Sequence, residues 1–239
     1  MERGNTNAST IIFAVILCLV SSTALTLVSK GLEPQKNLNV ELDRKSNVLK
    51  AFGVNTKNFD KQDVSGMYRE LINEYVVERN GSIVEGKKPA DLDPEKDSTF
   101  LPVYEAVGED SVKGYAIPIV GYGLWSWMYG YFALEKDLKT VKGITFYKHG
   151  ETPGLGGEIE AQWFQENFEG KKIYGPDGKL RPITVVKGKV EDVVKNESEQ
   201  KYYVDGISGA TMTSNGVTRT IEEALEKYAP HFEKLKGRV

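Results

Sequence analysis

The first pattern along the chain is an apolar stretch without charges near the N-terminus. No residue between Gly4 and Ser29 is charged, and Ile11 to Val28 consists mainly of Ile, Leu, Val, Phe and Ala. At the rise of an α-helix this stretch can cross a bilayer core about 30 Å thick. The pattern therefore predicts a single transmembrane helix.

Two other interpretations of this stretch are a cleaved signal peptide and a lipoprotein signal. Arg3 supplies a positive start, and Ser22-Thr23-Ala24 resembles a small-residue cleavage site. The apolar run resumes at Leu25, however, so it outlasts a typical signal core. A lipoprotein signal at Cys18 is disfavoured because the bulky Leu17 precedes it. An uncleaved anchor is the favoured interpretation.

Beyond this stretch the pattern alternates between helical and strand periods. Charged and apolar residues mix over 38–52, which is typical of a partly amphipathic helix, and apolar residues recur at helical spacing over 60–73. The Asn80-Gly81 pair between 75–79 and 82–84 is a strong signal for a β-hairpin.

From residue 100 onward the pattern is mainly that of strands separated by glycine or charge. Four strands are expected over 100–106, 113–120, 128–134 and 141–147. A helix over 158–168, a hairpin-like region over 173–186, strands at 190–194 and 202–204, and a C-terminal helix complete the pattern. It predicts an α+β fold with a mostly antiparallel sheet flanked by helices. Three regions are expected: 1–30 as N-terminus and anchor, 31–99 as a helical and hairpin membrane-proximal region, and 100–239 as the main domain.

Composition excludes several classes of function. The formal net charge of −3 does not favour nucleic acid as a partner. One cysteine and two histidines make internal disulfides impossible and a metal site improbable. The lysines and arginines that follow the apolar stretch outnumber Arg3, which taken alone favours a cytoplasmic C-terminal side, although long domains can translocate regardless of charge.

The segment from Asp205 to Ser214 has the clearest chemical character. It joins an apolar run, 202–204, to the start of the C-terminal helical pattern. A helix start presents free N–H groups and the positive end of the helix dipole, which favour a phosphate, and small residues such as Gly209 and Ala210 allow close approach. Redundant helix capping by Ser and Thr explains the same residues and is the more frequent case.

Two further stretches are rich in glycine and lie between expected elements. Gly121 to Trp127 combines glycines with aromatic rings on which a planar group can stack, or which fill the core. His149 to Glu158 contains Pro153-Gly154, which fits a type II turn. In that loop Glu151 and Thr152 can hydrogen-bond a polar edge of a ligand and Leu155 can pack on its face, or the loop is purely structural.

The three stretches, taken in order, resemble one family. Asp205-Gly-Ile-Ser-Gly-Ala-Thr211 looks like the flavinylation motif of the FMN-binding domain found in the C subunit of the sodium-translocating NADH:quinone reductase and in the G subunit of the Rnf complex. Gly-Tyr-Gly-Leu-Trp-Ser and His-Gly-Glu-Thr-Pro-Gly-Leu-Gly-Gly resemble the same family. The likeness extends over essentially the whole chain, and the segment after the anchor with the 60–98 insertion is closer to the quinone-reductase members.

The resemblance implies roles for individual residues. Thr211 would carry FMN through a phosphoester bond, and Asp205 would serve recognition by a separate flavin transferase that uses FAD and magnesium. The residues expected around the phosphate are Ser208, Gly209, Ala210, Thr213 and Ser214. Those expected around the isoalloxazine are Glu151, Thr152, Leu155, Leu124 and Trp125.

The resemblance also implies a setting. The chain would be an electron carrier without complete turnover alone, with no metal site and no catalytic residue of its own. Its partners would be the A, B, D, E and F subunits of the same complex, the flavin transferase and membrane lipid, and its domain would lie on the periplasmic side of a bacterial inner membrane. An Rnf-type subunit and a cofactor-free membrane-anchored assembly domain are the alternatives.

Overall fold

The computed structural model describes residues 6–56, 58–92, 97, 99–108 and 111–237, and they fall into two compact units that divide between Asp43 and Arg44. The first unit consists of helix α1 (Thr6–Ala51) up to that division. Among the described residues α1 is the one helix long and apolar enough to cross a membrane. The expected helix over 38–52 is not separate, because α1 continues through it with Pro34 inside.

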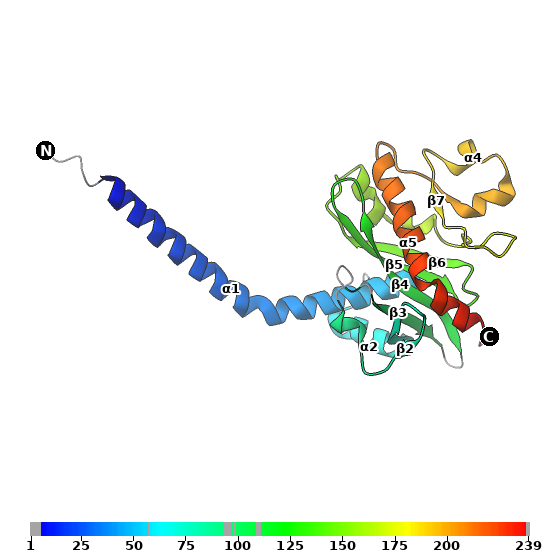
Figure 1. The fold of residues 1–239 in the computed structure, drawn as a ribbon, viewed down its shortest axis with the longest axis horizontal. Helices are drawn as coiled ribbons and strands as arrows, with labels where there is room; N and C mark the ends of the chain where they lie inside the picture. Colours follow the sequence, from blue (N-terminus) through cyan, green and yellow to red (C-terminus); the bar gives the residue numbers. More distant parts are fainter. Residues whose placement is uncertain (1–5, 57, 93–96, 98, 109–110, 238–239) are drawn as a thin grey trace. The chain divides into compact units, whose positions relative to one another are not determined.

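The second unit is built on a six-stranded antiparallel sheet (Figure 1). Its strands are β1 (Ile72–Glu78), β2 (Ile83–Val84), β3 (Phe100–Val107), β4 (Val112–Tyr122), β5 (Trp127–Glu135) and β6 (Val141–Lys148). Their order in the sheet is β2-β1-β3-β4-β5-β6, so each long strand from β3 to β5 pairs with the next one along the chain. The four strands expected after residue 100 and the hairpin at Asn80-Gly81 are thereby confirmed.

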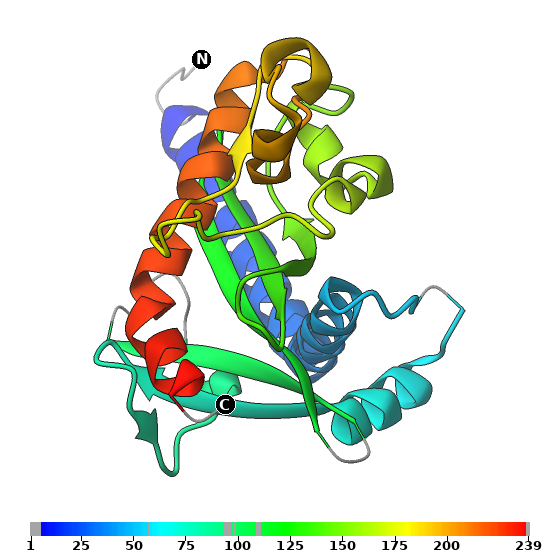
Figure 2. The ribbon, with the colours of Figure 1, turned by 90° about the vertical axis from the view of Figure 1, so that its right-hand side faces the viewer.

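Both faces of this sheet are covered, because neighbouring residues of one strand supply opposite cores. Val103 and Phe132 belong to the larger core on the side of α5 (Thr211–Lys236), which lies along the sheet in Figures 1 and 2. Tyr104 and Tyr131 belong to a smaller core on the other face. The last turns of α1 and helix α2 (Lys61–Leu71) supply the partners of that second core.

Residues 72–84 belong to the same sheet as the strands after residue 100. Strand β1 pairs with β3 over its full length, from Ile72 opposite Ala106 to Glu78 opposite Phe100. The segment expected to form a membrane-proximal hairpin is therefore an integral part of the main sheet, and its apolar side chains Val76 and Val77 are fully buried.

The segment between β6 and α5 differs most from the expectation. The helix expected over 158–168 is divided into η2 (Gly156–Glu160) and α3 (Gln162–Glu166). The prediction of a strand over 190–194 is wrong, because these residues form helix α4 (Val190–Val193). The neighbouring strand β8 (Tyr203–Val204) pairs in parallel with β7 (Thr184–Val185) and not with residues 190–194. Two short 3-10 turns, η1 (Pro89–Asp91) and η3 (Glu197–Tyr202), complete the described elements.

Candidate functional site

Two loops and the first turn of a helix, all far apart in the sequence, meet at the carboxylate of Glu151. Its Oε1 accepts the backbone N–H groups of Leu124, Trp125 and Ser126 at N···O distances of 3.1, 2.9 and 3.2 Å. Its Oε2 accepts the hydroxyl of Thr213 at 2.6 Å. One carboxylate thus joins the β4–β5 loop, the loop after β6 and the first turn of α5.

Two glycines of these loops lie so close to the Glu151 carboxylate that a side chain would not fit. A Cβ added to Gly123 would lie 2.6 Å from Glu151 Oε1. A Cβ added to Gly156 would lie 2.5 Å from Thr213 Oγ1 and 2.9 Å from Glu151 Oε2. No side chain can replace hydrogen at either position without displacing the carboxylate, so the glycines serve packing here as much as turn geometry.

The loop after β6 is held by its own hydrogen bonds as well. The N–H of Glu151 donates to His149 Nδ1 at 3.1 Å, and the N–H of Gly150 donates to Ser126 Oγ at 2.5 Å. On its other side, Nε2 of the His149 ring lies 3.3 Å from Glu160 Oε1. The loop is therefore positioned from both sides before any ligand is considered.

Electrostatics favour the ionised form of Glu151 although the side chain is only 5% exposed. Burial pushes the pKa of this carboxyl upward, but the Thr213 hydroxyl and the three backbone N–H groups outweigh burial and hold the pKa below its usual value. A buried anion of this kind is stabilised by donors from separate segments. Its charge consequently depends on the loops being in place.

The corner that precedes α5 has the features that a phosphate needs. The N-cap residue Ala210 makes no side-chain cap, and the first helical residue, Thr211, is exposed. Ser208 is exposed as well, and Gly209 has a φ of +73°, in the left-handed region that favours glycine. The corner therefore combines an exposed hydroxyl with a helix start, whose free N–H groups favour an anion.

Two hydroxyls of the first turn of α5 point inward. Thr213 is 1% exposed and its hydroxyl is engaged by Glu151, so its role in the structure is to fix the helix start to the loops. Ser214 is 3% exposed, and its Oγ has no hydrogen-bond partner among the residues that the structure describes. Such an orphaned hydroxyl is compatible with a group that binds at the helix start.

Large apolar side chains are exposed on the loops that meet at this corner and on the helix start itself. Leu124, Trp125 and Leu155 are 42%, 65% and 43% exposed, and Met212 is 59% exposed. Leu155 lies against the corner, because its Cδ2 would be 2.9 Å from a Cβ on Gly209. Exposed apolar surface beside an anion site suits a ligand that has a flat ring and a phosphate.

Thr152 contributes to the loop through its backbone. Its side chain is exposed, while its carbonyl accepts the N–H groups of Leu155 and Gly157 at 3.1 and 2.9 Å. Met212, next to Thr211, lies outside the set of residues predicted for the site. Its signal in the sequence is a lone apolar residue within the polar run at the helix start.

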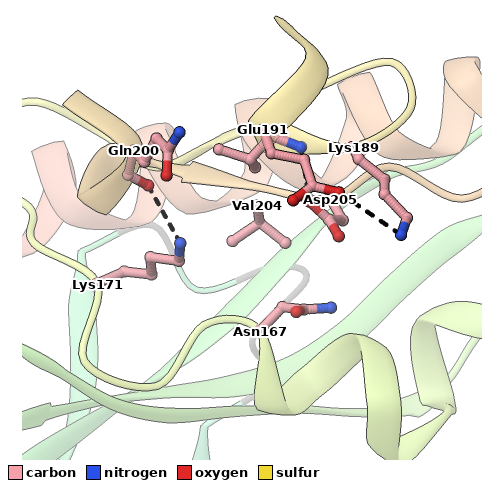
Figure 3. Close-up of a pocket in the computed structure, with 8 residues that line it drawn as sticks. Asn167, Lys171, Lys189, Glu191, Gln200, Val204 and Asp205 are labelled. Carbon is pink, nitrogen blue, oxygen red and sulfur yellow. Dashed lines mark hydrogen bonds and ion pairs between the residues drawn. The ribbon is translucent and has the colours of Figure 1, made fainter. Parts of the chain in front are cut away.

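Asp205, the first residue of the motif, lines a pocket that does not include Thr211 (Figure 3). Its Oδ1 accepts the N–H of Val190 at 2.7 Å, which fixes the start of α4. The pocket has a volume of about 310 Å³ and a polar lining that includes Lys171, Gln200 and Glu191. Burial lowers the pKa of Lys171, and the nearby Asp205 carboxylate opposes that shift.

Comparison with known proteins shows which family the chain resembles. Residues 123–226 match the family described as FMN-binding domain. The C subunit of the Na(+)-translocating NADH-quinone reductase of Pseudomonas aeruginosa is 30% identical over 95% of this chain and 94% of its own length. The protein of the same name from Vibrio anguillarum is 34% identical, over 99% of this chain and 98% of its own.

Two solved structures are similar in fold. The crystal structure of the C subunit of the Na(+)-translocating NADH-quinone reductase from Parabacteroides distasonis has a TM-score of 0.73 and 32% identity, over 84% of this chain and 96% of that one. Shewanella oneidensis NqrC has a TM-score of 0.71 and 27% identity, over 85% and 99%. These likenesses extend well beyond the three loops to most of the chain.

Proposed function

Because the chain belongs to the family of C subunits of the Na(+)-translocating NADH-quinone reductase, whose FMN-binding domain it contains, we propose that it carries FMN on Thr211 and relays electrons through it. The link is a phosphoester between the threonine oxygen and the FMN phosphate. The chain is a redox subunit of a larger translocase and completes no turnover alone.

One observation carries this proposal. The Glu151 junction ties two glycine-rich loops to the first turn of α5, where Thr211 offers an exposed hydroxyl at an uncapped helix start. A helix cap alone would need neither an exposed threonine at the first helical position nor apolar side chains flanking it. A phosphate with an attached ring system accounts for both features.

Each part of the corner has a task in this proposal. The N–H groups at the start of α5 neutralise the phosphate, with Ser208, Gly209 and Ala210 shaping its approach and Ser214 as an available hydroxyl. Leu124, Trp125 and Leu155 flank the ring and exclude water from it, and Thr152 offers a hydroxyl at its edge. FMN, when bound, supplies the capacity to accept and pass on one or two electrons.

Attachment requires a separate flavin transferase that uses FAD as donor. The Thr211 oxygen bonds to the phosphorus of the FMN moiety, the bond from that phosphorus to AMP breaks, and the hydroxyl proton passes to a base of the transferase. Thr211 is exposed, so its hydroxyl is accessible to such an enzyme. In this scheme Asp205 contributes to recognition by the transferase.

The apolar part of α1 provides the membrane anchor of the proposed assembly. Its length and composition suit a single crossing of a membrane. In this proposal the membrane is the bacterial inner membrane and the domain lies on its periplasmic side. A covalent tether retains the flavin on that side, where free cofactor would be lost. NADH oxidation and the sodium path belong to the partner subunits of the complex, which are A, B, D, E and F.

The test is a denaturing gel of the protein coexpressed with a flavin transferase. The expected result is a fluorescent band at the mass of this chain, with a mass increase equal to FMN less one water. Thr211→Ala should remove the band, and Thr99→Ala, which alters an exposed threonine before β3, should retain it. A dark band in the unaltered chain would support a cofactor-free assembly domain instead.

A further inference from the structure

We propose that Glu151 is a positioning residue, which orients the flavin on Thr211 without touching it. Its carboxylate holds the β4–β5 loop and the loop after β6 against the first turn of α5. This inference rests on the proposed attachment of FMN to Thr211. It assigns to Glu151 a role different from the expected hydrogen bond to the flavin edge.

The hydrogen-bonding capacity of the carboxylate is directed into the protein. Oε1 accepts three backbone N–H groups, and Oε2 accepts the Thr213 hydroxyl together with a longer contact of 3.2 Å from the N–H of Leu124. The side chain is 5% exposed. A flavin polar edge would therefore have to displace one of these donors to reach Glu151.

The two loops that Glu151 joins carry exposed apolar side chains and are tied to the first turn of α5, which begins at the attachment site Thr211. The backbone N–H groups of Leu124 and Trp125 are fixed by the carboxylate, while their side chains are 42% and 65% exposed. On the other side, the loop that contains Glu151 places Leu155 against Gly209. The carboxylate thus fixes the loop that carries Leu124 and Trp125 relative to the loop that carries Leu155 and to the first turn of α5.

Only an ionised carboxylate suits this position. The three backbone N–H groups around it can only donate, and a carboxylate accepts from them and from the Thr213 hydroxyl on its two oxygens without offering a proton. The N–H of Leu124 contacts both oxygens, so a glutamine of the same shape would turn its NH₂ group toward at least one backbone N–H group in either orientation. Glu151→Gln therefore loosens the junction with little change in volume.

The experiment uses the full-length protein, coexpressed with the flavin transferase and purified in detergent. Glu151→Gln is compared with the unaltered chain and with Glu135→Gln, a surface control on β5 whose side chain is 39% exposed. Gel fluorescence measures attachment, fluorescence anisotropy and iodide quenching measure flavin mobility and exposure, and a redox titration gives the midpoint potential.

The expected result is that the covalent band remains in all three proteins. In Glu151→Gln the anisotropy falls, the iodide quenching constant rises by about twofold or more as the loops open locally, and the potential moves toward that of free FMN. Glu135→Gln should match the unaltered chain. A purely structural role would lower the melting temperature without moving the potential or the quenching.

A second variant covers the case in which Glu151→Gln folds poorly. Thr213→Val keeps the carboxylate and its three backbone hydrogen bonds, and removes only the link to α5. It should shift anisotropy and quenching in the same direction by a smaller amount. Unchanged flavin mobility in Thr213→Val together with unchanged mobility or loss of folding in Glu151→Gln would overturn the inference. Absence of the band from the unaltered chain would instead refute the proposed function.

Discussion

The stability that Glu151 confers should depend on pH in a specific direction. In Glu151→Gln the Thr213 hydroxyl, which is 1% exposed, loses its charged acceptor, and a hydrogen bond to a charged group contributes about 1.5–3 kcal/mol. The three backbone donors lie in a loop whose side chains reach solvent, so water replaces part of their loss. We expect the free energy of unfolding at pH 7 to fall by about 3 kcal/mol.

The sign of the pH effect follows from the lowered pKa of Glu151 in the folded protein. A carboxyl with a depressed folded-state pKa stabilises fully above its unfolded pKa of about 4.3 and loses that contribution as the pH falls through the folded-state value. Glutamine does not titrate. The stability difference between the two proteins should therefore be constant near neutral pH and should shrink only at pH values below about 4.

Urea unfolding of the full-length protein in detergent measures this difference. The three tryptophans of the chain, Trp125, Trp127 and Trp163, all lie after Asp43, so their fluorescence reports on the domain and not on the apolar helix. A loss below about 0.5 kcal/mol at pH 7, which is ordinary for a surface substitution, would refute the reasoning. A difference that persists unchanged down to the acid limit of the folded state would refute it too.

Three other substitutions test packing and polar contacts elsewhere in the domain. Gly121→Ala places a Cβ on the side chain of Thr220 and should cost about 1–3 kcal/mol in thermal unfolding, with much of the loss recovered in the double variant with Thr220→Ala. Arg44→Met breaks a 2.8 Å ion pair with Glu74 and should cost about 3 kcal/mol by urea titration; an equal loss in Arg44→Met/Glu74→Leu would contradict this. Tyr228→Phe removes a buried 2.7 Å hydrogen bond to the carbonyl of Pro102 in β3 and should lower the free energy of unfolding by about 1–2 kcal/mol. An unchanged melting temperature would contradict this prediction.

The long strands could be predicted because their signal is local. Each of β3 to β6 is a run of apolar residues bounded by glycine or charge, and the Asn80-Gly81 pair specifies its hairpin by turn geometry. The helix at 190–193 could not be predicted in the same way. Its apolar run is short, and its start is fixed by Asp205, fifteen residues later, whose carboxylate accepts the N–H of Val190.

The residues of the site were recognisable one loop at a time, but their division of tasks was not. The sequence shows Glu151 in a glycine-rich loop and Thr213 at a helix start, each with a hydrogen-bonding side chain. Nothing local indicates that they bond to each other across 62 positions. The family resemblance places Thr213 at the phosphate, whereas the structure gives its hydroxyl a carboxylate partner.

The sequence by itself determined the apolar helix, the strands of the antiparallel sheet and the hydroxyl-rich start of the C-terminal helix, because periodicity, turn residues and helix-start composition act over a few neighbouring positions. The tertiary structure decided which oxygen meets which donor. Glu151 joins its two loops to the first turn of α5 only when β4, β6 and α5 are packed together, since hydrogen bonds between distant segments form where the fold brings donors and an acceptor within about 3 Å.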